Sequence, residues 1–505
     1  MRKPLLSLAV VAIVASGCAS ASAPTNGGYV APPPEHHLAT PPAQEVPRGT
    51  PYDGVTFQDP GVNRFVDPLK DNQSTFGLDV DTASYTVARR FVTDGNLPDP
   101  ASVRVEEFVN FFDQGYAPPE EGDFAIHVDG GPSPFLAEDE TLLRVGVKAR
   151  EDGSRTRPAA SLTFVIDVSG SMARENRLEL VKRSLHVLVD GLRRDDSVGI
   201  VVFGSDARVV LPPTGARDRA TILEAIDSLQ PEGSTNAEAG LRLGYEMARQ
   251  RLGEEGINRV ILASDGVANV GATDAETILA RIRDDAKTGI QLVTVGFGMG
   301  NFNDVLLEQL ADNGDGFYAY VNDIDEARRL FVDNLTGTLE SVALDARVQV
   351  EFDPRAVEAY RLIGFENRAI PDASFRDANV NAGAIGAGHS STALYALRLT
   401  GETGAARIGT VSLRWVEPIT NRQRELARDV RPTDLVGSFR ATSSTLKLDA
   451  LVAAAAERFR GSKYGSSYDL RDVVRVAGDV SEDLPQTDEV HDFLTLVSEA
   501  ARLER

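Results

Sequence analysis

The sequence is poor in cysteine, in basic charge and in long apolar runs, and each shortage excludes a class of protein. A single cysteine among 505 residues allows no intramolecular disulfide, so packing, with or without a metal, must stabilise the fold. The 52 lysines and arginines are outnumbered by 75 aspartates and glutamates, and a net charge of −23 argues against a nucleic-acid binder. What remains is a globular chain, 42% hydrophobic and 25% charged, long enough for several domains.

The first residues are predicted to be an export signal. A basic start precedes an apolar core over residues 5–15, which is too short to span a bilayer, and small residues precede Cys18. This pattern resembles the lipobox of bacterial lipoproteins, although Ala15 stands where leucine is usual. The resemblance implies a lipidated Cys18, and Ala19 after it implies the outer membrane of the bacterial cell envelope. The alternative is an ordinary secretory signal with an incidental cysteine.

The segment after the signal is predicted to be a flexible tether. Its composition is mainly proline, alanine, threonine, serine and glycine, and it has almost no aliphatic side chains to bury. Some forty such residues reach roughly 35 Å, so they would hold the folded part away from the lipid surface.

The motif Asp79-Val80-Asp81-Thr82 opens the possibility of an enzyme. Haloacid-dehalogenase-type phosphatases present a nucleophile and an acid in this way, at the end of an apolar stretch. They also need a downstream lysine and an acidic pair at strand ends, whereas the acidic pairs at 195–196 and 284–285 are expected in helical contexts. The phosphatase therefore stays an alternative. Two helices are expected next, over 83–93 and 103–112.

Strands and helices alternate through the middle of the chain, which predicts a mostly parallel, doubly wound α/β sheet. Strands are expected at 162–167, 198–203, 208–211, 260–263, 290–295 and 317–320, the second and third as a hairpin. Helices are expected at 175–192, 217–229, 237–251, 274–287, 303–310 and 325–339.

Three loops with oxygen-bearing side chains fall at the carboxyl edge of that sheet, where open α/β sheets bind ligands. Asp167 ends the first strand and is followed at two-residue steps by Ser169 and Ser171. The other two loops carry Thr235 and Asp265. Each loop alone also fits a helix cap or a turn, but oxygen ligands gathered from all three suit a hard cation such as Mg²⁺.

Together these loops resemble the metal-ion-dependent adhesion site of the von Willebrand factor type A (VWA) domain. The resemblance implies that a divalent cation, Mg²⁺ or alternatively Mn²⁺ or Ca²⁺, is held by Asp167, Ser169, Ser171, Thr235 and Asp265. Two carboxylates leave such an ion under-neutralised, so a carboxylate from outside can complete its coordination. The expected partner is a protein that supplies an acidic side chain, and no catalytic residue or small-molecule substrate is evident.

The flanking segments alternate with a period of two, which predicts a β-sandwich into which the doubly wound domain is inserted. Strands are expected at 124–128, 142–147, 346–352, 360–363, 391–399 and 407–415. The lone tryptophan, Trp415, is expected to fill the sandwich core. The end of the chain is predicted to be helical, with Gly461 as a C-terminal cap.

Three further segments resemble a family of bacterial VWA lipoproteins with a characteristic N-terminal segment and C-terminal region. They are 79–90, 361–369 and 384–389, and the resemblance extends over about residues 72–503. In that family the first segment is a signature and not a phosphatase motif. His389 is expected to be a structural loop histidine, because no nucleophile or acid partner accompanies it.

The predicted layout follows from these patterns. It comprises a signal peptide (1–17), the lipidated cysteine and tether (18–64), an N-terminal helical segment (65–120), sandwich strands (121–158), the VWA domain (159–340), more sandwich strands (341–440) and a C-terminal helical region (441–505). The predicted function is binding by a membrane-tethered protein and not catalysis. The alternatives are a metal-dependent or dehalogenase-like phosphohydrolase and a scaffold whose metal is only structural.

Overall fold

The computed structural model describes most of the chain after the predicted tether. The described residues are 52, 55–78, 80–151, 157–251, 256–266, 275–299, 303–377, 382–401, 407–418 and 420–504. The predicted signal peptide, Cys18 and Asp79 lie outside them. In this described part, no helix has the length and apolar character needed to cross a bilayer.

A six-stranded sheet forms the central domain, in the order β6-β5-β4-β7-β8-β9. The strands are β4 (Ala160–Asp167), β5 (Ser197–Phe203), β6 (Ala207–Gly215), β7 (Ile257–Ser264), β8 (Ile290–Phe297) and β9 (Tyr318–Val321). All neighbours are parallel except the β5–β6 hairpin. The predicted doubly wound, mostly parallel sheet is thus confirmed. Its inner strands are almost wholly buried because helices cover both faces.

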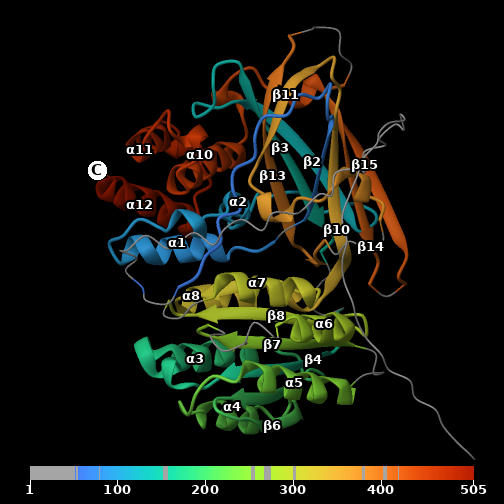
Figure 1. Ribbon diagram of the computed structural model, residues 1–505, viewed down its shortest axis with the longest axis vertical. Coiled ribbons are helices and arrows are strands. Elements are labelled where there is room, and N and C mark those ends of the chain that lie inside the picture. The colour runs from blue at the N-terminus through green and yellow to red at the C-terminus, as the bar shows by residue number, and fades with distance from the viewer. Residues whose placement is uncertain are drawn as a thin grey trace, which may run out of the picture. The chain divides into compact units, whose positions relative to one another are not determined.

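Helices pack on the two faces as the apolar stripes predict (Figure 1). On one face lie α3 (Arg177–Gly191), α4 (Arg219–Asp227) and α8 (Ile324–Arg328), and on the other α5 (Ala237–Ala248), α6 (Ala275–Ala286) and α7 (Asp304–Asn313). Helix α1 (Ala83–Thr93) of the N-terminal segment joins the second face through Val87 and Phe91. The N-terminal segment therefore contributes to the core of the central domain.

Two predictions in this domain were wrong in detail. The acidic pair at 195–196 lies in the turn before β5, because α3 has already ended at Gly191, and Asp196 there pairs with Arg157 at 2.6 Å. The helix expected over 325–339 is divided by a π-helical turn (Arg329–Asp333), after which α9 runs from Leu335 to Leu339. In that turn Arg329 donates to the Phe111 carbonyl at 2.7 Å, a contact that local periodicity cannot reveal.

Two antiparallel sheets form the predicted sandwich. One has the order β1-β10-β14-β15, with β12 paired to β10, and the other has the order β11-β13-β3-β2. Their strands are β1 (Gln73–Gly77), β10 (Ser341–Phe352), β12 (Ile385–Gly386), β14 (Gly409–Val416), β15 (Gln423–Val430), β11 (Val357–Ile363), β13 (Ser390–Leu399), β3 (Glu140–Ala149) and β2 (Phe124–Pro132). Strand β3 precedes the central domain and pairs with β13, which follows it, so the predicted insertion is confirmed.

The sandwich core contains one residue expected there, and three strands of the two sheets, β1, β12 and β15, were not among the expected sandwich strands. Trp415 is 6% exposed and lies edge-on to the Phe124 ring with 5.0 Å between ring centroids, as predicted for a core-filling side chain. Strand β15 was missed because it is an edge strand with mostly exposed, charged side chains. Such a strand lacks the alternating apolar pattern, and its charges suit an open edge.

The C-terminal helices cover the outer face of the β11-β13-β3-β2 sheet. They are α10 (Ser444–Phe459), α11 (Leu470–Asp479) and α12 (Asp488–Leu503), and they share a core with α2 (Val105–Asn110). Leu142 of β3 faces this core, whereas Leu143 faces the sandwich. Gly461 has a φ of 64° directly after the end of α10, the left-handed conformation that favours glycine at a helix C-terminus.

Candidate metal site

The predicted ligand loops meet at the carboxyl edge of the central sheet. We call residues 167–171, 233–235 and 264–266 the metal loops. Asp167 ends β4 with a fully buried side chain, and its Oδ1 accepts a hydrogen bond of 2.8 Å from the Ser169 amide. The neighbouring β7 ends at Ser264, one residue before Asp265. Because β4 and β7 are adjacent and parallel, their carboxyl ends bring the two aspartates together.

Hydrogen bonds link four of the five predicted ligands. Ser169 Oγ lies 2.9 Å from Ser171 Oγ, and Ser171 Oγ donates to Asp265 Oδ1 at 3.0 Å. Asp167 joins through the Ser169 amide, and its Oδ2 accepts from Ser264 Oγ at 2.7 Å. The four oxygen-bearing side chains therefore form one cluster.

The loop that carries Thr235 lies against the first metal loop. The Gly170 amide donates to the Gly233 carbonyl at 3.2 Å, so the second loop lies directly against the first. The alternative assignment of Thr235 as a helix cap is wrong, because Asn236 caps α5 by accepting from the Ala239 amide at 3.1 Å. Thr235 thus has no capping role and belongs to a loop that lies against the first metal loop.

The first loop does not cap α3. Ser169 is the N-cap residue of a short 3-10 helix (Gly170–Asn176), but its side chain makes no capping hydrogen bond there. Helix α3 begins at Arg177, two residues later than predicted, because Glu175 and Asn176 have left-handed backbone conformations with φ of 52° and 56°. The N-cap residue of α3 is Asn176, so neither Ser169 nor Ser171 occupies the cap position. The hydroxyls of both serines instead make hydrogen bonds within the cluster, which agrees with a ligand loop.

Burial shapes the electrostatics of the two aspartates. It raises the pKa of Asp167 to about 6, and hydrogen bonds from Ser169 and Ser264 offset only part of that shift. It also raises the pKa of Asp265, against the opposing effect of a guanidinium from Arg177. Buried carboxylates that are costly to ionise gain most from a bound cation.

Two residues contact the predicted ligands without having been predicted to do so. Ser264 donates to Asp167, and Arg177 Nη1 lies 2.6 Å from Asp265 Oδ2 with a nearly buried side chain. Gly298 makes room for this arginine, because a Cβ atom there would lie 2.3 Å from Arg177 Nε. Ser264 belongs to the predicted third loop, directly before Asp265, so its contact could have been anticipated. Arg177 gives no signal in the sequence, because its contact depends on the kinked entry to α3.

The donor set fits a hard divalent cation. The cluster offers two carboxylates and the hydroxyls of two serines, with Thr235 on the adjoining loop, and all are oxygen ligands of the kind that Mg²⁺ accepts. Across the described residues, no three or more histidine, cysteine, aspartate or glutamate side chains gather as ligands, so this part of the chain has no zinc-type or carboxylate-rich cage. The metal loops are therefore the candidate cation site.

The second aspartate of the phosphatase motif has a structural environment. Asp81 is 3% exposed, accepts from the Tyr318 amide at 2.9 Å and pairs with Arg368 at 2.8 Å. Its carboxylate links the N-terminal segment to β9 and to the loop after β11. Asp79, the other half of the motif, lies outside the described residues.

His389 lies far along the chain from any metal-loop residue and lines a cavity beside β9. Burial lowers its pKa to about 4, assisted by the charges of Lys148, Arg259 and Arg329, so its ring is neutral at pH 7. A neutral, partly buried loop histidine agrees with the structural role that the sequence predicts.

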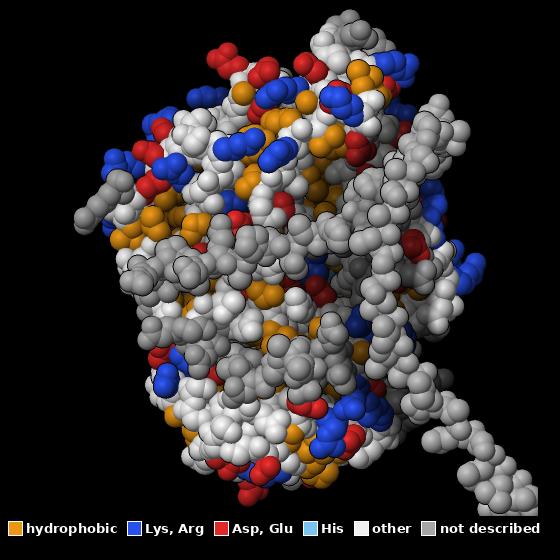
Figure 2. Space-filling model, viewed as in Figure 1, with side chains coloured by type: hydrophobic (Ala, Val, Ile, Leu, Met, Phe, Trp, Pro, Cys, Tyr) orange, Lys and Arg blue, Asp and Glu red, His pale blue; other side chains and the backbone are white. Residues whose placement is uncertain are grey.

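The face drawn in Figure 2 mixes acidic and basic side chains. Neither sign of charge dominates a broad area there, although the whole chain carries a net charge of −23.

Family models match three consecutive parts of the chain. Residues 161–333 match the von Willebrand factor type A domain, residues 52–144 match a model described as von Willebrand factor, and residues 337–503 match one described as "Uncharacterized protein YfbK, C-terminal". The doubly wound fold, its three loops and these matches define a protein with a VWA domain, a class that commonly mediates protein interactions.

The particular family follows from a relative that matches most of the chain. The chain is 35% identical over 439 residues to "Uncharacterized protein YfbK" of Escherichia coli (strain K12), and the match covers 82% of this chain and 75% of that protein. The chain therefore belongs to the YfbK family of bacterial VWA proteins.

More distant likenesses are confined to smaller parts or to coarse architecture. Inter-alpha-trypsin inhibitor heavy chain H3 of Homo sapiens is 31% identical over 215 residues, which are 39% of this chain and 23% of that protein. A solved structure titled "von Willebrand factor type A from Catenulispora acidiphila" is 16% identical with a TM-score of 0.44, covering 74% of this chain and 89% of that chain.

Proposed function

We propose that this chain is a lipid-anchored protein of the bacterial cell envelope whose VWA domain binds a protein partner through a divalent cation. The observation that carries the proposal is the pair of buried aspartates, Asp167 and Asp265, joined by serine hydroxyls at the carboxyl edge of the sheet. Ser169, Ser171 and Thr235 complete the proposed ligand set. Relatives support the VWA class but do not identify a partner.

The proposed ligands would contribute to cation binding in two ways. Asp167 and Asp265 would supply the negative charge, and the hydroxyls of Ser169, Ser171 and Thr235 would add neutral oxygens. A bound Mg²⁺ would supply an open coordination position with remaining positive charge. An acidic side chain of the partner suits that position, because it brings the missing negative charge. Arg177 would keep Asp265 in place from the protein side.

The proposed location depends on segments outside the described residues. Cys18 would carry the lipid, and the proline-rich residues after it would let the folded part reach away from the outer membrane. Mass spectrometry of the mature protein tests this step. A lipid-modified N-terminal cysteine is expected, whereas an unmodified N-terminus upstream or downstream of Cys18 would contradict it.

A binding role is also favoured over catalysis. A hydrolase at the metal loops would need a general base with a defined relation to the site. Among the described residues, Arg177 contacts Asp265 and is a poor base, and the Glu175 carboxylate nearby lies 3.6 Å from that guanidinium. The phosphatase alternative would use Asp81, whose carboxylate is already bound by Arg368 and the Tyr318 amide. Phosphate release from a general phosphatase substrate, lost on Asp79→Asn, would reverse this conclusion.

The test separates metal binding from partner binding. Calorimetry with Mg²⁺ should show binding to the full chain and none to Asp167→Ala. Capture from an envelope extract should then yield a partner with wild type in Mg²⁺, and lose it with Asp167→Ala or with a chelator. Asp284→Ala is the matched control, because Asp284 is exposed on α6. A partner captured equally in all conditions would leave the metal with only a structural role.

A further inference from the structure

The arginine that contacts the metal loops carries a charge that opposes a bound cation. Arg177 Nη1 lies 2.6 Å from Asp265 Oδ2, and only 4% of the arginine side chain is exposed. The guanidinium therefore compensates part of the charge of a proposed ligand, and solvent screens its own charge only weakly. A cation beside Asp265 would be repelled by Arg177 unless another carboxylate compensates the guanidinium.

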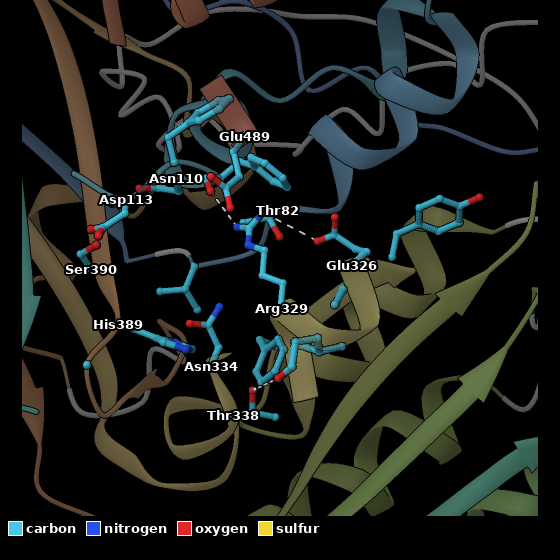
Figure 3. A pocket seen from close by; sticks show the side chains of 18 of the residues that line it. Thr82, Asn110, Asp113, Glu326, Arg329, Asn334, Thr338, His389, Ser390 and Glu489 are labelled. Carbon is cyan, nitrogen blue, oxygen red and sulfur yellow. Dashed lines mark hydrogen bonds and ion pairs between the residues drawn. The ribbon is translucent and has the colours of Figure 1, made fainter. Parts of the chain in front are cut away.

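Figure 3 shows how another largely buried arginine of the same domain is compensated. Arg329 lines a cavity of about 460 Å³ together with Asn110 and His389, and none of the metal-loop residues, all of which the structure describes, lines that cavity. The Glu326 carboxylate lies 3.7 Å from Arg329 Nη1, and Glu326 is not a proposed ligand. A cation at the metal loops would therefore not compete for the partner of Arg329. For Arg177, in contrast, the carboxylate at 2.6 Å belongs to a proposed ligand.

A second carboxylate beside Arg177 comes from Glu175. Glu175 Oε2 lies 3.6 Å from Arg177 Nη2, within ion-pair distance, and half of the glutamate side chain is exposed. Residues two apart on a helix do not face each other, so a regular helix would separate these side chains. The left-handed backbone of Glu175 and Asn176, with φ of 52° and 56°, brings them together before α3 begins. Such a conformation costs energy in residues other than glycine and is found preferentially at functional sites.

The charge of Glu175 is available to Arg177. Arg90 of the N-terminal segment also lies near Glu175, with 3.9 Å between Arg90 Nη2 and Glu175 Oε2. However, Arg90 Nε donates to Asp94 Oδ2 at 2.8 Å, so Asp94 at the end of α1 compensates Arg90. Glu175 is thus the carboxylate that can compensate Arg177 when a cation shares Asp265.

We propose that Glu175 is a positioning residue of the cation site, which acts through Arg177. Its carboxylate would compensate the guanidinium, so that Arg177 can hold one oxygen of Asp265 without cancelling the charge that the cation needs. This role rests on the proposed function, because it concerns the same cation. It adds to the site a charged residue that is not one of the five predicted ligands.

Calorimetric titration of the full chain with Mg²⁺ tests this role. Glu175→Gln removes the charge but keeps the shape of the side chain. It should weaken Mg²⁺ binding about threefold to tenfold, because Arg177 is then uncompensated. Glu179→Gln is the matched control, since Glu179 lies on the next turn of the chain, is 61% exposed and is paired with Lys182. The control should bind Mg²⁺ like wild type, and an equal affinity in Glu175→Gln would overturn the proposal.

Arg177→Met shows whether Glu175 acts through the arginine. This variant should bind Mg²⁺ about tenfold more tightly than wild type, because the opposing charge is gone. In the Arg177→Met background, Glu175→Gln should change the affinity no more than Glu179→Gln does. An equal loss of affinity on Glu175→Gln in both backgrounds would overturn the proposal, because Glu175 would then attract the cation directly.

The outcomes separate this role from the proposed function and from a structural role. Wild type that binds no Mg²⁺ would contradict the proposed function and with it the role of Glu175. Wild type that binds Mg²⁺ as tightly as Glu175→Gln does would contradict only the role of Glu175. Urea unfolding with a chelator checks the fold of each variant, because a purely structural role would lower stability there and leave the Mg²⁺ affinity unchanged. The comparison of Glu175→Gln with Glu179→Gln is decisive even if Arg177→Met does not fold.

Discussion

Buried carboxylates occur in the metal loops and also at the junction, where α7 of the VWA domain meets the N-terminal segment. Different groups bind the carboxylates in the two places. At the junction, Asp304 accepts from Arg104 at 2.7 Å and from the Tyr318 hydroxyl at 3.0 Å. In the metal loops, Asp167 accepts from the Ser169 amide and the Ser264 hydroxyl, which are neutral donors. Both aspartates are at most 1% exposed, so burial alone does not distinguish them.

The difference separates a structural site from a ligand site. A buried carboxylate with a guanidinium partner has its charge compensated within the fold, whereas one with only neutral donors retains a charge that a cation can compensate. Asp265 is intermediate, because Arg177 binds one of its oxygens and Ser171 the other. The following substitutions test this comparison, from the largest expected effect to the smallest.

Removing the junction arginine should cost the most. Arg104→Met would leave Asp304 and Glu107 buried without their cation, and the free energy of unfolding should fall by about 3–5 kcal/mol. Urea unfolding measures this loss. Arg242→Met, which breaks an exposed pair with Glu246, is the control and should cost no more than about 0.5 kcal/mol. Similar losses in both variants would show that the buried ion pairs at the junction stabilise the fold no more than an exposed ion pair does.

Removing the charge of Asp167 should have the opposite effect in the absence of metal. Asp167→Asn should unfold at the same or a higher urea concentration than wild type, because a buried charge disappears. At Mg²⁺ about 100-fold above its dissociation constant, wild type should gain about 2.7 kcal/mol and the variant nothing. Asp284→Asn is the exposed control. A variant that gains as much as wild type from Mg²⁺ would disprove the ligand role.

Arg177→Met tests the intermediate case. Without metal, Asp265 would lose its cation, and stability should fall by about 1–3 kcal/mol. Added Mg²⁺ should restore more stability to this variant than it adds to wild type, since it replaces the missing positive charge. Urea unfolding with and without Mg²⁺ measures the two increments. Equal increments would mean that Arg177 and the cation act independently.

His389 should give the smallest effect at pH 7, where its contribution to stability is still complete, and a larger effect only as the pH falls. Because its pKa in the fold is about 4, below its ordinary value of 6.5, its contribution to stability is complete above pH 6.5 and is lost as pH falls toward 4. Wild type should therefore lose up to about 1.4 kcal/mol per pH unit more than His389→Phe over this range. Unfolding at several pH values checks this, and parallel curves would contradict it.

Much of the fold was predictable because local patterns report local structure. The stripe of Val181, Leu185 and Leu188 identified α3 and its buried face, and the period of two identified most sandwich strands. The polar edge strand β15 had no such pattern and was missed. The π-helical turn at Arg329 was missed because it accompanies a contact with Phe111, more than two hundred residues away.

In the candidate metal site, too, some features follow from the local sequence and others only from tertiary packing. The sequence by itself placed Asp167, Ser169, Ser171 and Asp265 at or after the carboxyl ends of parallel strands, which meet at one edge of the sheet, and the resemblance to the VWA domain added Thr235 and the predicted ligand roles. Only the tertiary structure decided that Arg177 reaches Asp265 and that Asn110, Arg329 and His389 share a cavity. The reason is physical: periodicity and strand ends are properties of short segments, whereas these contacts exist only after distant segments have packed together.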